Sequence, residues 1–330
     1  MKVCTALFGP TDAVERAAAL REAGAAGVFT FEGPHDVFAP LTLASTVGGL
    51  DLMTNVAIAF PRNPIQLAHQ AYDHQVLSGG RFTLGLGTQI RTQIEKRYGA
   101  SFDRPVARMR ELVGALRAIF EVWQTGERLD FRGEFYRHTL MTPTFNPGPS
   151  PFGPPPIYVG ALGPRLTRAV AEVADGLLVM PFGSARFLRE VTMPGVREGL
   201  AAAGRRPTDL AVVPEVIVSV GEDPGDHEAT RRLLAFYGST PAYRPVLEVH
   251  GWGDLQPELH AMTKQGRWTE MGGLISNEML NTIAACGTPA QIAAHIRDRA
   301  EAADGLVDTV CLYQPGPITV DALAAIIDAL

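Results

Sequence analysis

The chain has 330 residues, of which 46% are hydrophobic, and its formal net charge is −6. This length fits either two modest domains or one (β/α)₈ barrel with insertions. The acidic balance gives no basic surface that would attract nucleic acid or an anionic membrane, so we expect neither as a partner. The opening residues MKVCTALFGP hold too short an apolar run for a signal peptide or a membrane span, which favours a cytoplasmic location.

Metal-binding and disulfide patterns are missing from the sequence. Cys4, Cys286 and Cys311 stand far apart without CxxC spacing, so neither a zinc site nor a disulfide framework is indicated. The closest pair of histidines, His69 and His74, is five residues apart and would occupy different faces of a helix. We therefore predict no metal.

A short apolar run, a turn and an amphipathic helix recur eight times along the chain. The predicted strands cover residues 3–8, 28–31, 56–60, 82–86, 157–160, 177–180, 212–220 and 307–313. Continuously apolar strands between helices indicate a parallel sheet covered on both faces, and eight such units close into an α/β TIM barrel. We predict one domain over residues 1–330; a doubly wound open sheet is the alternative.

Capping signals mark several of the helices between these strands. Asp12 and Glu15 are spaced for a capping box at the first helix. Asn63-Pro64 predicts a helix start, and Gly79-Gly80 predicts its end. An apolar spacing favours a helix over residues 105–123. Thr288-Pro-x-Gln291 predicts a further capped start near the end of the chain.

Two stretches depart from the repeat and are predicted to be insertions. In residues 126–156, the segment 129–136 alternates like a β-hairpin and then meets a proline-rich connection. Residues 238–286, between the last two strands, are rich in glycine and aromatic side chains. We expect this second insertion to cover the substrate through His250 and Trp252; ordinary packing of these rings is an equally good interpretation.

The active site of a (β/α)₈ barrel lies at the carboxyl ends of its strands. After the second predicted strand, Glu32, His35 and Asp36 bring three ionisable groups together within five residues. A hydride-transfer enzyme needs a proton donor or acceptor at such a rim. The alternative is a turn stabilised by an ion pair.

The next junctions are rich in small residues. The turn Ala59-Phe60-Pro61 after the third strand indicates only a tight connection. Gly87, Thr88 and Gln89 follow the fourth strand and offer backbone amides and a hydroxyl to a flat ring or a phosphate. After the fifth strand, the segment from Gly160 to Arg165 forms a helix amino terminus, which favours an anion. Gly85-x-Gly87 is not a dinucleotide fingerprint, because Ile90 occupies the third glycine position.

In order and spacing, these segments resemble the luciferase-like monooxygenase superfamily and, within it, the oxidoreductases that depend on the deazaflavin coenzyme F420. The resemblance covers nearly the whole chain. It rests on the opening strand with residues 13–25, and on residues 29–36, 57–64, 77–87, 131–136, 157–164, 174–176 and 287–289.

The resemblance implies a deazaflavin lying over the carboxyl ends of the strands. A bulge with a non-proline cis peptide would back the ring, at the bond between Ala59 and Phe60. Gly87, Thr88 and Gln89 would contact the ring or its ribityl chain. The phosphate would lie in the turn after strand five, formed by Gly160, Ala161, Leu162 and Gly163 with Arg165 beside it. A homodimer is a further implication.

The family's acid/base residue follows strand two, often as an Asp-His pair, and this chain departs from that pattern. Glu32 takes the acidic position, and His35 comes only after Gly33-Pro34. We favour His35 as the proton carrier because imidazole exchanges protons readily near neutral pH; Glu32 would contact the cofactor or orient the histidine, and Asp36 remains open. The predicted function is F420-dependent hydride transfer to or from a small organic substrate. The alternatives are an FMN-dependent monooxygenase, a deazaflavin-binding protein without turnover, and a metal-dependent barrel hydrolase.

Overall fold

Parallel strands form a closed barrel in the computed structural model, which describes residues 1–316 and 318–330. The strands are β1 (Lys2–Ala6), β2 (Gly27–Thr30), β3 (Asp51–Thr54), β4 (Ala57–Ile58), β5 (Phe82–Gly87), β6 (Phe131–Arg132), β7 (Arg137–His138), β8 (Ile157–Ala161), β9 (Gly176–Val179), β10 (Ala211–Val220), β11 (Ala285–Gly287) and β12 (Thr309–Tyr313). The barrel follows the order β10-β12-β1-β2-β3-β5-β8-β9, and a parallel pairing of β9 with β10 closes it. The predicted (β/α)₈ TIM barrel is confirmed.

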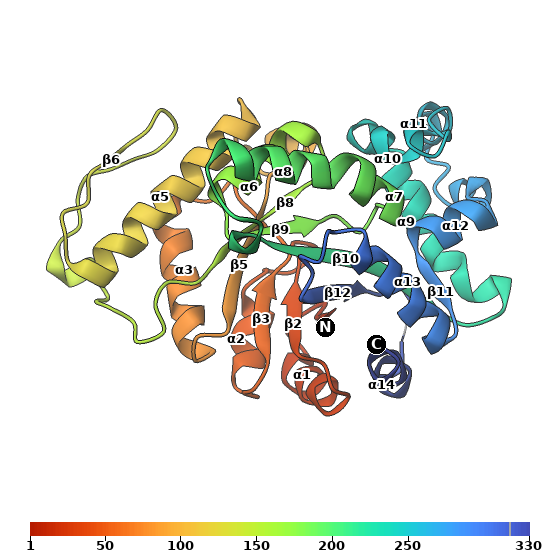
Figure 1. Ribbon diagram of the computed structural model, residues 1–330, viewed down its shortest axis with the longest axis horizontal. Coiled ribbons are helices and arrows are strands. Elements are labelled where there is room, and N and C mark those ends of the chain that lie inside the picture. Colours follow the sequence, from red (N-terminus) through yellow and green to blue (C-terminus); the bar gives the residue numbers. More distant parts are fainter. Residues whose placement is uncertain (317) are drawn as a thin grey trace.

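Helices surround the barrel (Figure 1). The α-helices are α1 (Ala13–Glu22), α2 (Ala39–Ser45), α3 (Pro64–Leu77), α4 (Arg91–Lys96), α5 (Pro105–Thr125), α6 (Pro164–Val173), α7 (Ala185–Phe187), α8 (Met193–Ala202), α9 (Glu228–Gly238), α10 (Arg244–Glu248), α11 (Leu255–Lys264), α12 (Asn277–Ile283), α13 (Pro289–Glu301) and α14 (Val320–Asp328). The other helical turns are η1 (Pro143–Phe145), the π-helical η2 (Leu188–Thr192), η3 (Pro207–Asp209), η4 (Pro224–His227), η5 (Pro241–Tyr243) and η6 (Met271–Leu274). Among the described residues, no helix is both long and apolar enough to span a bilayer.

Most of the predicted helix starts are confirmed by side-chain caps. The Asn63 side chain accepts a hydrogen bond from the Ile65 amide at the start of α3. Thr288 and Gln291 form the reciprocal capping box of α13. The expected box at Asp12 is wrong, because its side chain makes no capping bond. The Asp12 backbone (φ −120°, ψ 19°) lies outside the extended region that lets an N-cap side chain reach the helix amides.

The third barrel strand lies earlier in the chain than predicted. Strand β3 pairs with β2 over four residues, from Gly27↔Asp51 to Thr30↔Thr54. The predicted segment 56–60 contains only the short β4, which pairs with β5 alone. A cis peptide joins Asn55 to Val56 between β3 and β4. The cis bond expected between Ala59 and Phe60 is therefore misplaced by four residues.

The hydrophobic core has three parts. Side chains that fill the barrel interior include Cys4, Phe29, Met53, Leu178 and Cys311. A second and larger layer packs between the strands and the surrounding helices. A third cluster belongs mainly to the second insertion and its contacts with the barrel. The barrel is therefore filled, and ligands can reach it only at its ends.

Both predicted insertions contain ordered structure. In the first, β6 and β7 form the expected antiparallel hairpin, with Phe131 opposite His138. The second, for which no secondary structure was predicted, is mainly helical and runs through α10, α11 and α12. It ends in β11, which pairs with the last three residues of β10, Val218–Val220. The two insertions lie at opposite ends of the long axis of the molecule (Figure 1).

Candidate active site

Val56 lies where three strand ends meet. A Cβ atom added to Gly87 at the end of β5 would lie 2.4 Å from Val56 Cγ2, and one added to Gly160 on β8 would lie 3.4 Å from Val56 Cγ1. Because neither strand carries a side chain there, the half-buried Val56 sits between them at the mouth of the barrel. The result is a floor of one valine and two glycines, suited to a flat ring.

Glu32 connects the loop after β2 to this floor. Its Oε2 accepts hydrogen bonds from the Ile58 amide (2.8 Å) and from Arg62 Nη1 (2.7 Å), and its Oε1 accepts one from Arg62 Nη2 (3.1 Å). The carboxylate is thus fully engaged in a bidentate pair. Arg97 Nη2 also donates to the carbonyl oxygen of Gly33, which links the same loop to the segment after β5. The loops that leave β2, β4, β5 and β8 therefore converge on one rim.

The other two ionisable groups after β2 differ in their surroundings. Asp36 Oδ1 accepts hydrogen bonds from the amides of Phe38, the N-cap residue of α2, and of Ala39, so this carboxylate is engaged at the start of the helix. His35 is exposed, and its ring lies against Gly9, where an added Cβ would be 3.1 Å from His35 Cδ2. The imidazole makes no hydrogen bond within the part of the chain that the structure describes. Among the described residues, His35 is the one of the three whose side chain is not engaged in hydrogen bonds.

The segment after β5 has partly exposed polar side chains. Gly87 is buried, and Thr88 and Gln89 are half-buried. Gln89 adopts a left-handed backbone (φ 54°), and its side-chain oxygen accepts a hydrogen bond from the Ile90 amide. Ala59 and Phe60, whose bond was expected to back the cofactor ring, are 0% and 2% exposed. These two residues therefore lie behind the floor and can support it only from within the core.

The turn after β8 leads into α6 without a side-chain cap. Gly163 is the N-cap residue, and Gly163 and Arg165 are both exposed. Ala161 is buried, while Leu162 packs partly against the core of the second insertion. The first turn of α6 keeps the positive end of its helix dipole facing solvent beside Arg165, an arrangement that can hold an anion.

Aromatic rings line the opposite part of the mouth. The Phe31 ring centroid lies 5.8 Å from that of Phe8 and 5.5 Å from that of Tyr313. Phe8 remains 52% exposed. Tyr237 on α9 contacts Phe182 after β9, with ring centroids 5.8 Å apart. These five rings come from five loops or elements and form an apolar wall.

His250 and Trp252 do lie together, beside the loop after β9. Their rings stack with centroids 4.6 Å apart, and His250 Nε2 is 2.8 Å from the Ser184 hydroxyl oxygen. Burial lowers the pKa of His250, and the nearby Arg186 adds to this effect. Trp268 is 50% exposed and contacts Phe236 instead. The insertion therefore brings His250 and Trp252, but not Trp268, to the loop after a barrel strand.

Glu215 is a buried carboxylic acid and a candidate site residue that the sequence analysis missed. It lies inside the barrel on β10, is 7% exposed, and its Oε2 accepts a hydrogen bond from Asn55 Nδ2 at 3.0 Å. Burial raises the pKa of Glu215 to about 8. In the sequence, Glu215 is the single carboxylate within the apolar run Val212–Val220, and this pattern could have indicated a buried acid. Such a residue is rarely buried without a purpose.

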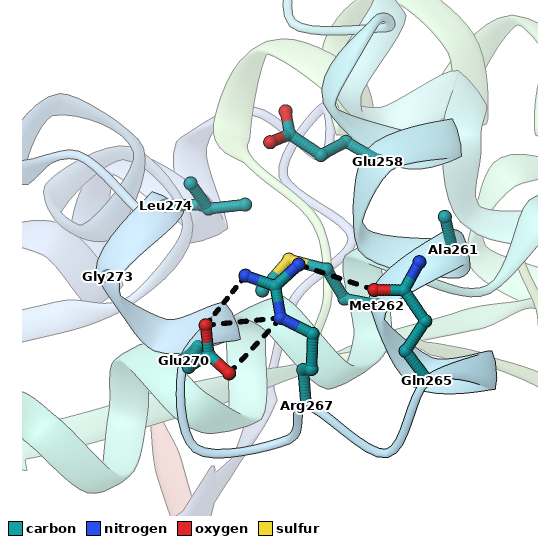
Figure 2. Close-up of a pocket in the computed structure, with 8 residues that line it drawn as sticks. All are labelled: Glu258, Ala261, Met262, Gln265, Arg267, Glu270, Gly273 and Leu274. Atoms are coloured by element: carbon teal, nitrogen blue, oxygen red, sulfur yellow. Dashed lines mark hydrogen bonds and ion pairs between the residues drawn. The ribbon is translucent and has the colours of Figure 1, made fainter.

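Two cavities lie away from this mouth. One, of about 420 Å³, is in the second insertion and is lined by Met262, Arg267 and Glu270 among others. Figure 2 shows the Arg267 guanidinium already bound by Glu270 and Gln265. The other, of about 660 Å³, lies at the amino end of the barrel around Tyr158 and Asp308. Within residues 1–316 and 318–330, no three His, Cys, Asp or Glu side chains group as metal ligands.

Comparison with known proteins places this barrel in a family. The family model described as luciferase-like monooxygenase matches residues 4–304. The chain belongs to the luciferase-like monooxygenase family. This luciferase-like protein is 48% identical over 303 residues to an uncharacterized protein of Mycobacterium tuberculosis, an alignment that covers 90% of this chain and 88% of the relative.

Relatives with named activities are more distant. A 5,10-methylenetetrahydromethanopterin reductase of Archaeoglobus fulgidus is 30% identical over 249 residues, covering 73% of the luciferase-like chain and 70% of the reductase. The solved coenzyme F420-dependent tetrahydromethanopterin reductase of Methanopyrus kandleri superposes with a TM-score of 0.82 at 20% identity, covering 98% and 96% of the two chains. The superposition on the Methanopyrus kandleri reductase supports the assignment of the fold.

Proposed function

We propose that this luciferase-like protein is an oxidoreductase that binds coenzyme F420 and transfers a hydride between it and a small, uncharged organic substrate. The observation that carries the proposal is the floor of Val56, Gly87 and Gly160, which three strand ends build at the mouth of the barrel. Relatives named F420-dependent glucose-6-phosphate dehydrogenase support the choice of cofactor.

In this proposal the deazaflavin ring would rest on Val56, for whose side chain Gly87 and Gly160 leave room. Thr88 and Gln89 contact the ring or its ribityl chain. The phosphate lies at the start of α6, among the amides of Gly160, Ala161, Leu162 and Gly163 with Arg165 beside it. The bound deazaflavin supplies a carbon that gives or takes hydride.

The substrate would lie against the aromatic wall. Phe8, Phe31 and Tyr313 present faces and edges that favour a flat or apolar molecule. His250 and Trp252 would close the site from the insertion side, with Ser184 fixing the orientation of the imidazole. His35, at the exposed edge, is proposed to exchange protons with solvent, while Glu32 holds the floor in position.

Quenching of tryptophan fluorescence during titration with F420 or with FMN tests the cofactor. We expect F420 to bind at micromolar or lower concentration and FMN to bind more weakly. A leucine at position 160 would project over Val56 without a backbone clash, since its Cβ has ordinary contacts. G160L should therefore weaken F420 binding at least tenfold.

The matched control is G273L. Gly273 has open space around an added Cβ and lies in the insertion beside the cavity shown in Figure 2. This variant should bind F420 like the wild type. Tight FMN binding without F420 binding would favour the monooxygenase alternative, and F420 binding without reduction by any substrate panel would favour a cofactor-carrying protein.

A further inference from the structure

A carboxylic acid is enclosed beneath the mouth of the barrel. Glu215 is 7% exposed, and Oε2 is held by Asn55 at 3.0 Å. No Lys or Arg within the described residues forms an ion pair with it, and Oε1 has no hydrogen-bond partner among them. Because burial raises the pKa to about 8, the side chain keeps its proton near neutral pH.

The groups around this carboxyl are uncharged or weakly acidic. Cys311 on β12 is its register partner, and Cys4 on β1 is in turn the partner of Cys311. Burial raises the pKa of Tyr237 on α9 and of Tyr313 on β12, and the nearby Glu215 contributes to both shifts. No neighbour can take the proton from Glu215 at neutral pH, so an acceptor has to arrive from outside the protein.

Tyr313 connects this carboxyl to the aromatic wall. The Tyr313 ring, close to the carboxyl, is 5.5 Å from the Phe31 ring at the mouth. On the other side, Asn55 donates its hydrogen bond to Glu215 and is joined by a peptide bond to Val56, the valine of the proposed ring floor. The acid thus lies between the surface proposed for the cofactor and the surface proposed for the substrate.

We propose that Glu215 donates a proton to the bound substrate from inside the barrel. The inference rests on the proposed function, because the hydride must come from the reduced deazaflavin. As a substrate carbonyl carbon accepts the hydride, the carbonyl oxygen takes the proton from Glu215. The C=O π bond is replaced by one C–H and one O–H bond. Glu215 remains as a carboxylate and regains its proton from solvent, and the reverse reaction uses this carboxylate as the base.

The variant E215Q separates this role from a structural one. Glutamine has the same shape, its side-chain oxygen can still accept the Asn55 hydrogen bond, and it is neutral like the protonated acid. A purely structural Glu215 would therefore tolerate the change. A proton donor would not, because an amide does not release a proton at these pH values.

Infrared difference spectra of wild type minus E215Q test the protonation state without any cofactor. We expect the carbonyl stretch of a protonated carboxyl near neutral pH, with loss of this band at a midpoint of about 8. After F420 is bound, saturating acetone, the smallest ketone probe, should shift the band to lower frequency. A carboxylate at neutral pH, or a band that acetone does not move in the F420-bound protein, overturns the proposal.

Kinetics with reduced F420 and acetone provide the second readout. We expect E215Q to lower kcat about 100-fold or more, with KM and F420 affinity within twofold of wild type. The matched control E222Q changes an exposed glutamate just after the same strand and should behave like wild type. Equal kcat for E215Q and wild type contradicts the role. Failure of F420 to bind wild type would instead reject the proposed function, while the spectrum of the free protein still reports on Glu215.

Discussion

The Glu32 carboxylate accepts hydrogen bonds from both terminal nitrogens of Arg62 while also holding the amide of Ile58. The side chains are only 12% and 18% exposed, so loss of either partner leaves a poorly solvated charge. We expect E32Q or R62A to lower the free energy of unfolding by roughly 2–4 kcal/mol. Urea denaturation measures this.

The exposed pair between Glu228 and Arg232 is the control for that prediction. E228Q should change stability by less than about 1 kcal/mol, because surface pairs are well solvated. Equal effects of E32Q and E228Q would mean that the Glu32 contact is not structural.

His35 can be tested by chemical rescue because it is exposed. H35A should reduce turnover about 100-fold if the imidazole exchanges the reaction's proton with solvent. Added imidazole should restore part of this activity, since small molecules can reach the position. E215Q should show no rescue, because the glutamine side chain fills the position that an imidazole molecule would need. An H35A variant with full activity would remove His35 from the site.

Glu215 should make stability depend on pH. Its pKa in the folded protein, about 8, is above the ordinary 4.5, so the folded state holds a proton that the unfolded chain has released between these values. The free energy of unfolding of the wild type should therefore fall as pH rises through this window, by about 1.4 kcal/mol per unit of pKa difference. E215Q has no titrating group at this position and so lacks this pH-dependent contribution to the free energy of unfolding. Its stability relative to wild type should therefore increase over the same pH range. Urea titrations at several pH values check the sign; a constant difference would show that Glu215 has an ordinary pKa.

Gly87 should be intolerant of any side chain. A methyl group there would lie 2.4 Å from Val56 Cγ2, so Val56 must move. We expect G87A to cost about 1–3 kcal/mol and to weaken F420 binding, as measured by urea denaturation and fluorescence titration. G273A, with open space around its Cβ, should do neither. If G87A bound F420 with wild-type affinity, the surface formed by Val56, Gly87 and Gly160 would not be where the ring binds.

Local signals with a clear mechanism could be predicted from the sequence. Asn63 and Thr288 cap their helices through side-chain oxygens, and the apolar stripe that predicted a helix over residues 105–123 is the buried face of α5. These features depend on neighbouring residues alone. The closed barrel followed from the repeat itself, because parallel strands need both faces covered.

Other features depend on contacts that span the sequence. The third strand was predicted at residues 56–60, yet β3 begins at Asp51, where its pairing with β2 and β5 fixes it. Asn55 and Glu215 are 160 positions apart, so their hydrogen bond has no local pattern. The sequence analysis did not use the spacing of Asp36 to the amides of Phe38 and Ala39, which donate hydrogen bonds to its carboxylate at the start of α2.

Strand β10 is shared between two parts of the molecule: its first residues pair with β9, its middle with β12 and its last three with β11. The helical insertion is thereby anchored by main-chain hydrogen bonds to the same strand that carries Glu215. Exchange of residues 221–284 between homologues, with Val220 and Ala285 kept as junctions, should therefore transplant substrate selectivity while the hydride chemistry stays with the recipient barrel.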